Sequence, residues 1–556
     1  MPARPAGSAP EAKEAAFEQA MATVSPDVSA KRRDLHDVVL LAGQGQLDSA
    51  AKLLRQRLGT NPDDPEALFL LGDIARRQSR FADAEALFAR CVELAPRFDA
   101  ARFHYANVLL EIAKAEAAQA QAETLLAREP RNPVFQALKA MALELADEHA
   151  AAASLWRQIV ENGAPAEMAV RYANVLRVLG RREESIAACR GALARDPSYG
   201  RAWWALAQLS TFRFSDDDVA AMQALADRSQ LSNDNRVPLL FALGKAHGQR
   251  KQYEKSFAAY ARGNALKRLS TPHDPGVLTA YVARCKAVLT PDFFRAREAC
   301  GCSSGAPIFI VGMTRAGSTL VEQILASHSE IEGTRELFNL GSIAGKLQRE
   351  HGASSYPALL ENLGADTFRQ FGEQYLGTAR VHRKLGRRHF IDKAGQNFVH
   401  LGLLHLMLPN AKIVDVRRHP LACGWSNFTQ YYANGQNETY RLADFAALYR
   451  DYVALMAHFD SVLAGRVHRV HYEQLVADPE TEIRRLLDYL ELPFEESCLA
   501  FHENARAVST VSSEQVRSPL YKEALDHWRH YEPWLGPLKS ALGPLADSYP
   551  NVPTFG

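Results

Sequence analysis

The sequence predicts a multidomain protein of class α + α/β. An N-terminal α-solenoid of helical repeats is followed by a P-loop-like α/β domain with a mainly parallel sheet. Two observations lead to this prediction. Prolines recur about every 34 residues in the first part of the chain, at positions 62, 96, 130, 165 and 197. After residue 300 this period stops, and short apolar runs alternate with helical patterns.

The period is typical of tetratricopeptide repeats, each a pair of antiparallel helices. The clearest unit spans residues 65–96, where Gly72 lets the two helices approach closely and Phe88 fills the gap between them. A late unit spans 238–268. Residues 209–232 break the period, which indicates an inserted helical hairpin.

Stacked helix pairs curve, so the repeats predict a concave surface for a peptide or protein partner. A helical spacer or a platform for a homodimer is the alternative, because repeats alone do not define a partner. The predicted segments are a disordered stretch at 1–32, the tetratricopeptide domain at 33–270, a helical linker at 271–305, the α/β domain at 306–545 and a tail at 546–556.

Composition narrows the classes of function. The 556 residues include 65 Lys and Arg against 64 Asp and Glu, which argues against attraction of the whole protein to nucleic acid or an anionic membrane. The N-terminal stretch lacks a signal-peptide pattern and no run of about 18 apolar residues occurs, so we expect a cytoplasmic protein. The seven cysteines are scattered, which favours reduced thiols, and no cluster of metal ligands is evident.

One glycine-rich stretch carries the chemical signal. Residues 310–320, IVGMTRAGSTL, have the spacing of the phosphate loop G-x-x-x-x-G-K-[ST], with Ser318 at the lysine position. A strand pattern at 306–312 precedes the loop and a helix pattern at 318–328 follows it, which is the context that such a loop needs. The N–H groups at the start of that helix favour an anion.

The missing lysine restricts the ligand. In nucleotide kinases and NTPases this lysine reaches the β- and γ-phosphates, so its absence disfavours a nucleotide kinase. Arg315 in the loop is suited to a phosphate and a neighbouring anionic group. Further strand patterns at 411–418 and 466–475 complete a parallel sheet, and ligands of such sheets bind at the carboxyl ends of the strands.

Four segments, 307–340, 391–426, 470–493 and 512–535, resemble the bacterial tetratricopeptide-repeat sulfotransferases, which are related to tyrosylprotein sulfotransferases. The resemblance implies transfer of a sulfuryl group from 3′-phosphoadenosine 5′-phosphosulfate (PAPS) to an acceptor hydroxyl, with PAP as product and no metal. PAPS has no β- and γ-phosphates, which agrees with a serine at the lysine position.

The resemblance assigns roles to the residues that match the family motifs. Its catalytic assignments are Glu336 as general base, Lys393 and Arg315 as groups that stabilise the transferring sulfuryl group, and Ser512 near the sulfate. Its donor-binding assignments are Arg315, Ala316, Gly317, Ser318 and Thr319 for the 5′-phosphosulfate, Arg418 and Ser426 for the 3′-phosphate, Tyr472 beside the adenine, and Ser512, Arg517 and His527.

Four positions depart from the family pattern: Thr314 replaces proline, Ala316 serine, His419 aspartate, and His527 a lysine or arginine. A histidine at 527 is charged only part of the time near neutral pH. The departures leave a second reading open, in which a weakened or inactive sulfotransferase fold serves as a repeat scaffold for protein interaction.

Three assigned residues also have structural alternatives. Glu336 could cap the next helix, Lys393 could form a surface ion pair with Asp392, and Tyr472 could be a packing residue. The sequence does not identify the acceptor. The match at Glu336 favours a protein tyrosine, with a sugar, a lipid or a small molecule as open alternatives.

Overall fold

A computed structural model describes residues 31–334, 336–337, 339–352, 356–504, 506, 515–520 and 523–552. Residues 1–30 of the predicted disordered stretch lie outside this range. The chain divides into two compact units, Met1–Leu179 and Gly180–Gly556. In the described part of the chain, no helix has the length and apolar character needed to span a bilayer.

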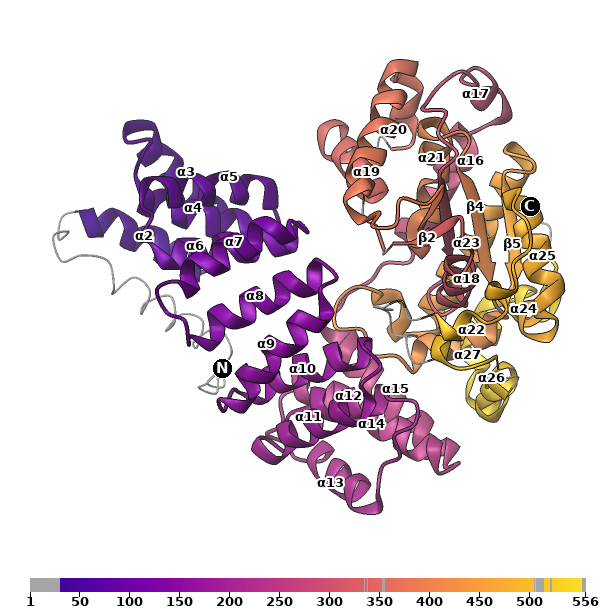
Figure 1. The fold of residues 1–556 in the computed structure, drawn as a ribbon, viewed down its shortest axis with the longest axis horizontal. Helices are drawn as coiled ribbons and strands as arrows, with labels where there is room; N and C mark the ends of the chain where they lie inside the picture. The colour runs from indigo at the N-terminus through magenta and orange to yellow at the C-terminus, as the bar shows by residue number, and fades with distance from the viewer. Residues whose placement is uncertain are drawn as a thin grey trace. The chain divides into compact units, whose positions relative to one another are not determined.

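Helix pairs build the first unit, as the proline period predicts (Figure 1). Asp64 and Asn132 cap helices that begin with proline, and each side chain accepts hydrogen bonds from two backbone N–H groups. A Cβ on Gly72 would lie 3.0 Å from the ring of Phe88, which confirms the predicted close approach. The helices are α2 (Lys31–Gly43), α3 (Leu47–Thr60), α4 (Pro65–Arg77), α5 (Phe81–Leu94), α6 (Asp99–Glu111), α7 (Ala115–Leu126), α8 (Pro133–Leu145), α9 (His149–Glu161) and α10 (Ala166–Val178).

The second unit begins with further helices, and the division falls inside the segment predicted as one repeat domain, 33–270. Its first helices are α11 (Arg182–Arg195), α12 (Gly200–Gln208), α13 (Asp216–Ala226), α14 (Asn233–Gln249), α15 (Tyr253–Ser270), α16 (Gly276–Val288) and α17 (Pro291–Arg295).

The predicted hairpin at 209–232 is wrong, because this segment contains only one helix, α13. Ser215 and Asp218 form a capping box at its start, so the helix cannot extend further toward the N-terminus. Before the cap, Phe212 and Phe214 are both buried, with ring centroids 5.0 Å apart. Phe212 and Phe214 thus anchor a non-helical connection in a segment that the sequence predicts to be helical.

Five parallel strands confirm the predicted α/β domain. The order in the sheet is β2-β3-β1-β4-β5. The central strand β1 is buried throughout, in keeping with its continuous apolar run. The strands are β1 (Pro307–Gly312), β2 (Ile331–Gly333), β3 (His389–Asp392), β4 (Lys412–Arg417) and β5 (Val467–His471).

The strand order places a switch point between β1 and β4. The chain leaves β1 toward β2 on one side of the sheet and leaves β4 toward β5 on the other, so the two connections diverge and open a crevice at the strand ends. The α-helices of this domain are α18 (Ser318–Ala326), α19 (Asn339–His351), α20 (Ala365–Ala379), α21 (Leu401–Met407), α22 (Pro420–Phe428), α23 (Leu442–Val462), α24 (Tyr472–Ala477), α25 (Pro479–Leu490), α26 (Glu523–Asp526), α27 (Gly536–Leu542) and α28 (Leu545–Ser548). The 3₁₀ helices are η2 (Ala358–Asn362), η3 (Arg380–His382), η4 (Gly395–His400), η5 (Asn437–Tyr440), η6 (Glu496–Cys498), η7 (Phe501–Glu503), η8 (Gln515–Arg517) and η9 (His527–Trp534).

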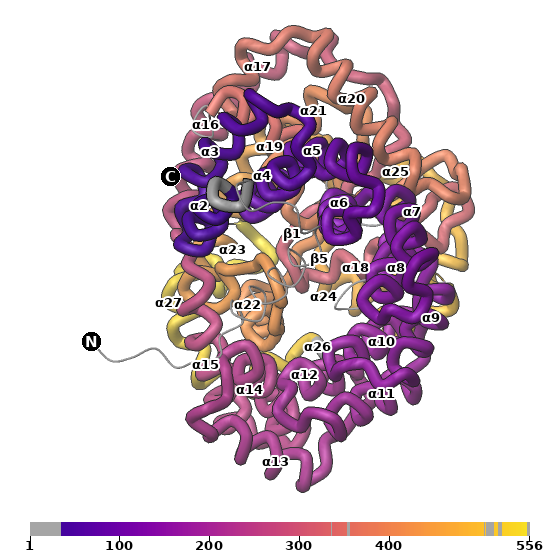
Figure 2. The backbone as a smooth tube through the Cα atoms, turned by 90° about the vertical axis from the view of Figure 1, so that its left-hand side faces the viewer, coloured from indigo at the N-terminus to yellow at the C-terminus, as the bar shows by residue number. Residues whose placement is uncertain are grey.

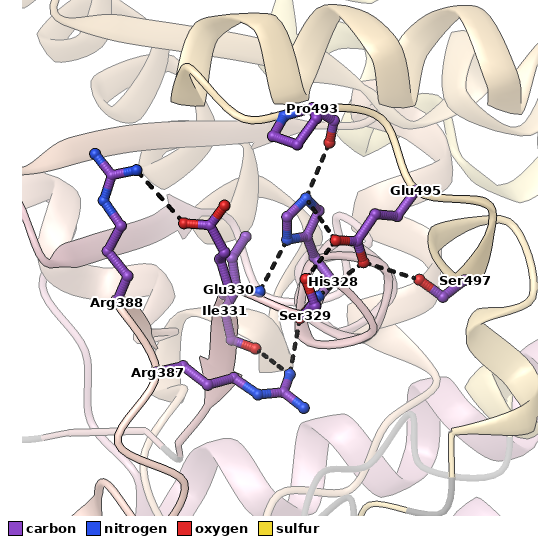
Figure 3. A network of polar contacts seen from close by, with 9 residues as sticks. All are labelled: His328, Ser329, Glu330, Ile331, Arg387, Arg388, Pro493, Glu495 and Ser497. Atoms are coloured by element: carbon purple, nitrogen blue, oxygen red, sulfur yellow. Dashed lines mark hydrogen bonds and ion pairs between the residues drawn. The ribbon is translucent and has the colours of Figure 1, made fainter.

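A buried histidine fixes the turn from α18 to β2 (Figure 3). Nδ1 of His328 accepts from the N–H of Glu330 at 3.1 Å, so Nε2 is the donor to the carbonyl of Pro493 at 2.9 Å. Arg387 donates to the carbonyls of His328 and Ile331, both at 2.7 Å. Both ring nitrogens of His328 are therefore hydrogen-bonded, and the turn that leads toward residue 336 is held on two sides.

Aromatic packing joins the helical pair α14–α15 to the α/β domain. The Phe257 ring lies 6.0 Å from Trp425 of α22 and 5.9 Å from Trp534 of η9. Asn264, which is 1% exposed, donates to the carbonyl of Phe428 at 2.8 Å. Both views show α15 beside α22 (Figures 1 and 2). These helices and the sheet therefore form one packed body.

We expect the substitution Phe257→Ala to destabilise the second unit by about 1–3 kcal/mol, because it removes a partly buried ring from this cluster. Urea denaturation followed by tryptophan fluorescence measures the change. Leu269→Ala on the same helix is the control, since Leu269 is 78% exposed and its removal changes stability by less than about 0.5 kcal/mol. Equal effects of the two substitutions would contradict the packing described here.

Candidate active site

The glycine-rich loop connects β1 to α18 through strained backbone. Arg315 has φ 67° and Gly317 has φ 107°, both in the left-handed region. A Cβ on Gly317 would lie 2.5 Å from Cδ2 of Tyr472, so both the backbone angle and the available space require glycine. A Cβ on Gly312 would lie 2.4 Å from the carbonyl oxygen of Val416. The two glycines therefore allow the loop to lie closely against β4 and α24.

Hydrogen bonds from α22 and its neighbours hold the loop in this conformation. Asn427 donates to the carbonyl of Thr314 at 2.8 Å, and the hydroxyl of Thr314 donates to Gln436 at 2.7 Å. Arg418 donates to the carbonyl of Arg315 at 3.3 Å. These bonds fix the start of the loop at the position where the family has a proline. The departure at Thr314 thus does not leave the loop unanchored.

A cavity of about 1010 Å³ opens beside the loop, at the upper end of the range of about 300–1,000 Å³ typical of ligand pockets. It brings together ten of the site residues that the sequence predicts. They are Arg315, Gly317, Ser318, Thr319, Glu336, Lys393, Arg418, Ser426, Tyr472 and His527.

Three other predicted site residues are not among the lining residues. Ala316 belongs to the loop, but its side chain is only 1% exposed and does not line the cavity. The guanidinium of Arg517 lies against Gly180, where a Cβ would be 3.7 Å from Nη1. Ser512 lies outside the described residues.

Arginines concentrate positive charge on the side of the cavity formed by the loop and α22. Nε of Arg315 donates to the hydroxyl of Ser426 at 3.1 Å. The guanidinium of Arg418 lies 4.8 Å from the centroid of the Tyr472 ring, in cation–π geometry. The sequence assigns these four residues to the donor, and the fold gathers them from the β1–α18 loop, the connection after β4, α22 and α24.

The two adjacent arginines at the end of β4 have separate tasks. The side chain of Arg417 is 2% exposed and pairs with the buried Asp415 at 3.0 Å. Its guanidinium also lies 5.2 Å from the centroid of Tyr452. Of the two arginines only Arg418 lines the cavity, whereas Arg417 pairs with buried residues and has a structural role.

Lys393, which also lines the cavity, lies within a group of carboxylates. Its Nζ is 2.5 Å from Oε1 of Glu336 and 3.9 Å from Oε2 of Glu322. Arg506 donates to Glu322 at 2.8 Å, so two cations balance two carboxylates. The side chain of Lys393 is 4% exposed, whereas that of Glu336 is 52% exposed. The group is therefore no surface ion pair, and Glu336 is its accessible end.

Both histidines at departures from the family pattern are explained by packing. His419 stacks on Trp528 with ring centroids 5.1 Å apart, and its Nδ1 caps α22 by accepting from the N–H of Leu421. Burial and then the charge of Lys245 lower the pKa of His527 to about 4. At pH 7 the His527 ring is therefore neutral, not partly charged as its ordinary pKa predicts.

The sequence reading missed several residues of this site. Glu322 reads as a polar residue within an amphipathic helix, and Arg506 has no motif around it. Asn427 directly follows the assigned Ser426, which could have drawn attention to it. Arg213 and Lys245 also line the cavity, although they precede the α/β domain by many residues.

The fold and the cavity together define an α/β domain of P-loop-like architecture with arginines in its cavity wall, preceded by helical repeats. Residues 307–496 match the sulfotransferase family, and residues 38–97 and 75–142 match two tetratricopeptide-repeat models. The chain therefore combines tetratricopeptide repeats with a sulfotransferase-family domain, which confirms the resemblance recognised in the sequence. These matches support sulfotransfer activity in general terms.

Two relatives and one solved structure illustrate the similarity. An uncharacterized protein of Aquifex aeolicus (strain VF5) is 26% identical over 522 residues, which cover 90% of this chain and 68% of that protein. Protein-tyrosine sulfotransferase 1 of Danio rerio is 24% identical over 266 residues, 45% of this chain and 74% of that protein. The sulfotransferase domain from the Synechococcus PCC 7002 olefin synthase is 25% identical, with a TM-score of 0.31, over 41% of this chain and 89% of that domain.

Asp392, next to Lys393, makes stability depend on pH. It is fully buried, and the hydroxyl of Tyr375 donates to its Oδ2 at 2.8 Å. Burial raises the pKa of Asp392 from 3.8 to about 7. Between these values the folded protein holds a proton that the unfolded chain releases, so the contribution of Asp392 to stability is present below pH 4 and is lost as pH rises toward 7.

We expect the stability of the native protein to fall, relative to that of an Asp392→Asn variant, by about 1.4 kcal/mol per pH unit within this window. Asparagine stays neutral at every pH, so the variant lacks the dependence. Urea denaturation of both proteins at pH 5, 6 and 7 gives the difference. A constant difference across the three pH values would show that Asp392 is not protonated in the folded protein.

Proposed function

We propose that this protein transfers a sulfuryl group from PAPS to an acceptor hydroxyl, with Glu336 as general base. One observation carries the proposal. A phosphate-type loop without its lysine shares one cavity with two arginines, Lys393 and Glu336, inside a domain that matches the sulfotransferase family.

The residues of the cavity suit this donor. The amides at the start of α18, together with Arg315, would bind the 5′-phosphosulfate, since helix N-termini and guanidinium groups both favour such anions. Arg418 and Ser426 would hold the 3′-phosphate. The ring of Tyr472, already stacked under Arg418, would border the adenine. A donor without β- and γ-phosphates leaves no role for a lysine at position 318.

The proposed reaction is an in-line displacement at sulfur. The acceptor oxygen forms a bond to sulfur, and the bond between sulfur and the oxygen of the 5′-phosphate breaks. The hydroxyl proton passes to Glu336, and the products are PAP and a sulfate ester. Lys393 would stabilise the transferring group as Glu336 turns to the acceptor, and a single preorganised donor of this kind contributes about 3–4 kcal/mol.

We propose a protein tyrosine as the acceptor, and the named tyrosine sulfotransferases among the relatives support this choice. The cavity is large enough for a nucleotide and a side chain together. In this proposal the tetratricopeptide repeats bind the acceptor protein, and the reaction takes place in the cytoplasm.

Donor binding is the first test. We expect calorimetry to show micromolar binding of PAP to the native protein, and Arg418→Ala to weaken it by about tenfold to a hundredfold, the effect of one lost charged hydrogen bond. The control is Arg388→Ala, since the Arg388 side chain is 65% exposed and pairs only peripherally with Glu330 at 3.4 Å. If the native protein binds no PAP, the donor assignment is wrong and the inactive-scaffold reading is favoured.

The second test concerns the general base. We expect Glu336→Gln to lower kcat for sulfate transfer from labelled PAPS to tyrosine peptides by about 10²–10⁴, because the amide cannot take up the proton. The affinity for PAP should stay within about threefold, since the amide oxygen can still accept from Lys393. Glu480→Gln, at an exposed position of α25, is the control. A variant with native kcat would remove Glu336 from the mechanism.

A further inference from the structure

Two cations from outside the matched sulfotransferase segment reach the cavity. Arg213 lies in the connection before α13, and Lys245 lies on α14. Both line the same cavity as Arg315, Arg418 and Ser426. Neither belongs to residues 307–496, the part of the chain that matches the sulfotransferase family.

The packing of α14 directs Lys245 into the cavity. Ser256 of α15 donates to the carbonyl of Gly244 at 2.7 Å and lies 3.1 Å from the hydroxyl of Tyr531 in η9. A Cβ on Gly248 would lie 2.9 Å from that same hydroxyl, so the backbone of α14 lies directly against η9. Lys245 lies one turn before Gly248 on α14 and lines the cavity together with His527.

Lys245 is exposed to the cavity and has no hydrogen-bond or ion-pair partner among the residues that the structure describes. The surrounding protein, followed by the charges of Arg213 and Arg315, lowers its pKa. Like charges brought together in this way repel one another, and a bound anion would relieve that repulsion. The ammonium group is thus placed for a ligand.

The position of Lys245 identifies which anion this would be. The His527 ring lies 5.6 Å from the Tyr531 ring, and the Tyr531 hydroxyl lies against the backbone of α14 at Gly248, one turn after Lys245. Lys245 and His527 both line the cavity, so Lys245 lies on the side where the resemblance places a cation beside the 3′-phosphate. The carboxylates around Lys393, where the sulfuryl transfer would take place, form a separate group.

We propose that Lys245, together with Arg213 of the same cavity wall, binds the 3′-phosphate of the donor nucleotide and supplies a cation where the family has a lysine or arginine and this chain has His527. This inference rests on the proposed function, because it names a further binding residue of the same site. It also gives the departure at position 527 an explanation: the missing cation comes from helix α14.

Calorimetry with two nucleotides tests the inference on the full chain. PAP carries the 3′-phosphate and adenosine 5′-phosphate lacks it, so the ratio of the two affinities reports the 3′-phosphate subsite alone. We expect Lys245→Met to weaken PAP binding by about tenfold to a hundredfold and to leave the binding of adenosine 5′-phosphate within about twofold. Lys245→Arg should retain most of the preference for PAP.

Lys255→Met is the matched control, because Lys255 is an exposed lysine of α15 that does not line the cavity. A Lys245→Met protein that keeps the native ratio of affinities overturns this inference and leaves the proposed function intact. An equal loss for both nucleotides also overturns it, because the effect would then not concern the 3′-phosphate. Absence of PAP binding in the native protein overturns the proposed function itself.

Discussion

The left-handed backbone of the loop between β1 and α18 is the constraint on which the site depends. A non-glycine residue at φ 67° is strained, and it persists only where neighbouring groups hold it. Here the side chain of Arg418 donates a hydrogen bond to the carbonyl oxygen of Arg315, and Nε of Arg315 donates to the hydroxyl of Ser426. The strained residue thus carries the charge that the cavity needs, and the residues that restrain it are those assigned to the donor. The residues that hold the strained backbone of Arg315 are therefore the same residues that would bind the donor.

Much of the fold could be predicted, because its signals are local. The proline period, the close approach at Gly72 and the apolar run of β1 each reflect contacts within a few tens of residues. The prediction of a helical hairpin at 209–232 was wrong, because the connection at 209–215 is held by packing and not by a local helical signal. Phe212 and Phe214 stand two residues apart, which is a spacing typical of extended chain, and both side chains are buried in the fold.

The site was predictable where motifs exist and unpredictable where charge arrives from distant parts of the chain. The loop and Arg418 have recognisable neighbours in the sequence. The pairing of Lys393 with Glu336 requires the adjacency of β1, β2 and β3, and the ion pair of Glu322 with Arg506 joins residues 184 positions apart. Lys245 lies in a segment that reads as a structural repeat. In such cases the residue type alone does not indicate a site residue, because its role depends on the residues that lie beside it in the fold.

The aromatic contact between α15 and α22 shows that the packed body begins earlier in the chain than the family match does. The family match begins at residue 307, yet the rings of Trp425 and Trp534 are covered by Phe257, fifty residues earlier. The family match and the packed body of the second unit therefore have different limits along the sequence. A gene fragment cut at the family boundary would expose an apolar patch of large rings, which favours aggregation. Helix α15 thus acts as an intramolecular cover for these rings, and a variant that exchanged this helix would have to supply an equivalent apolar face.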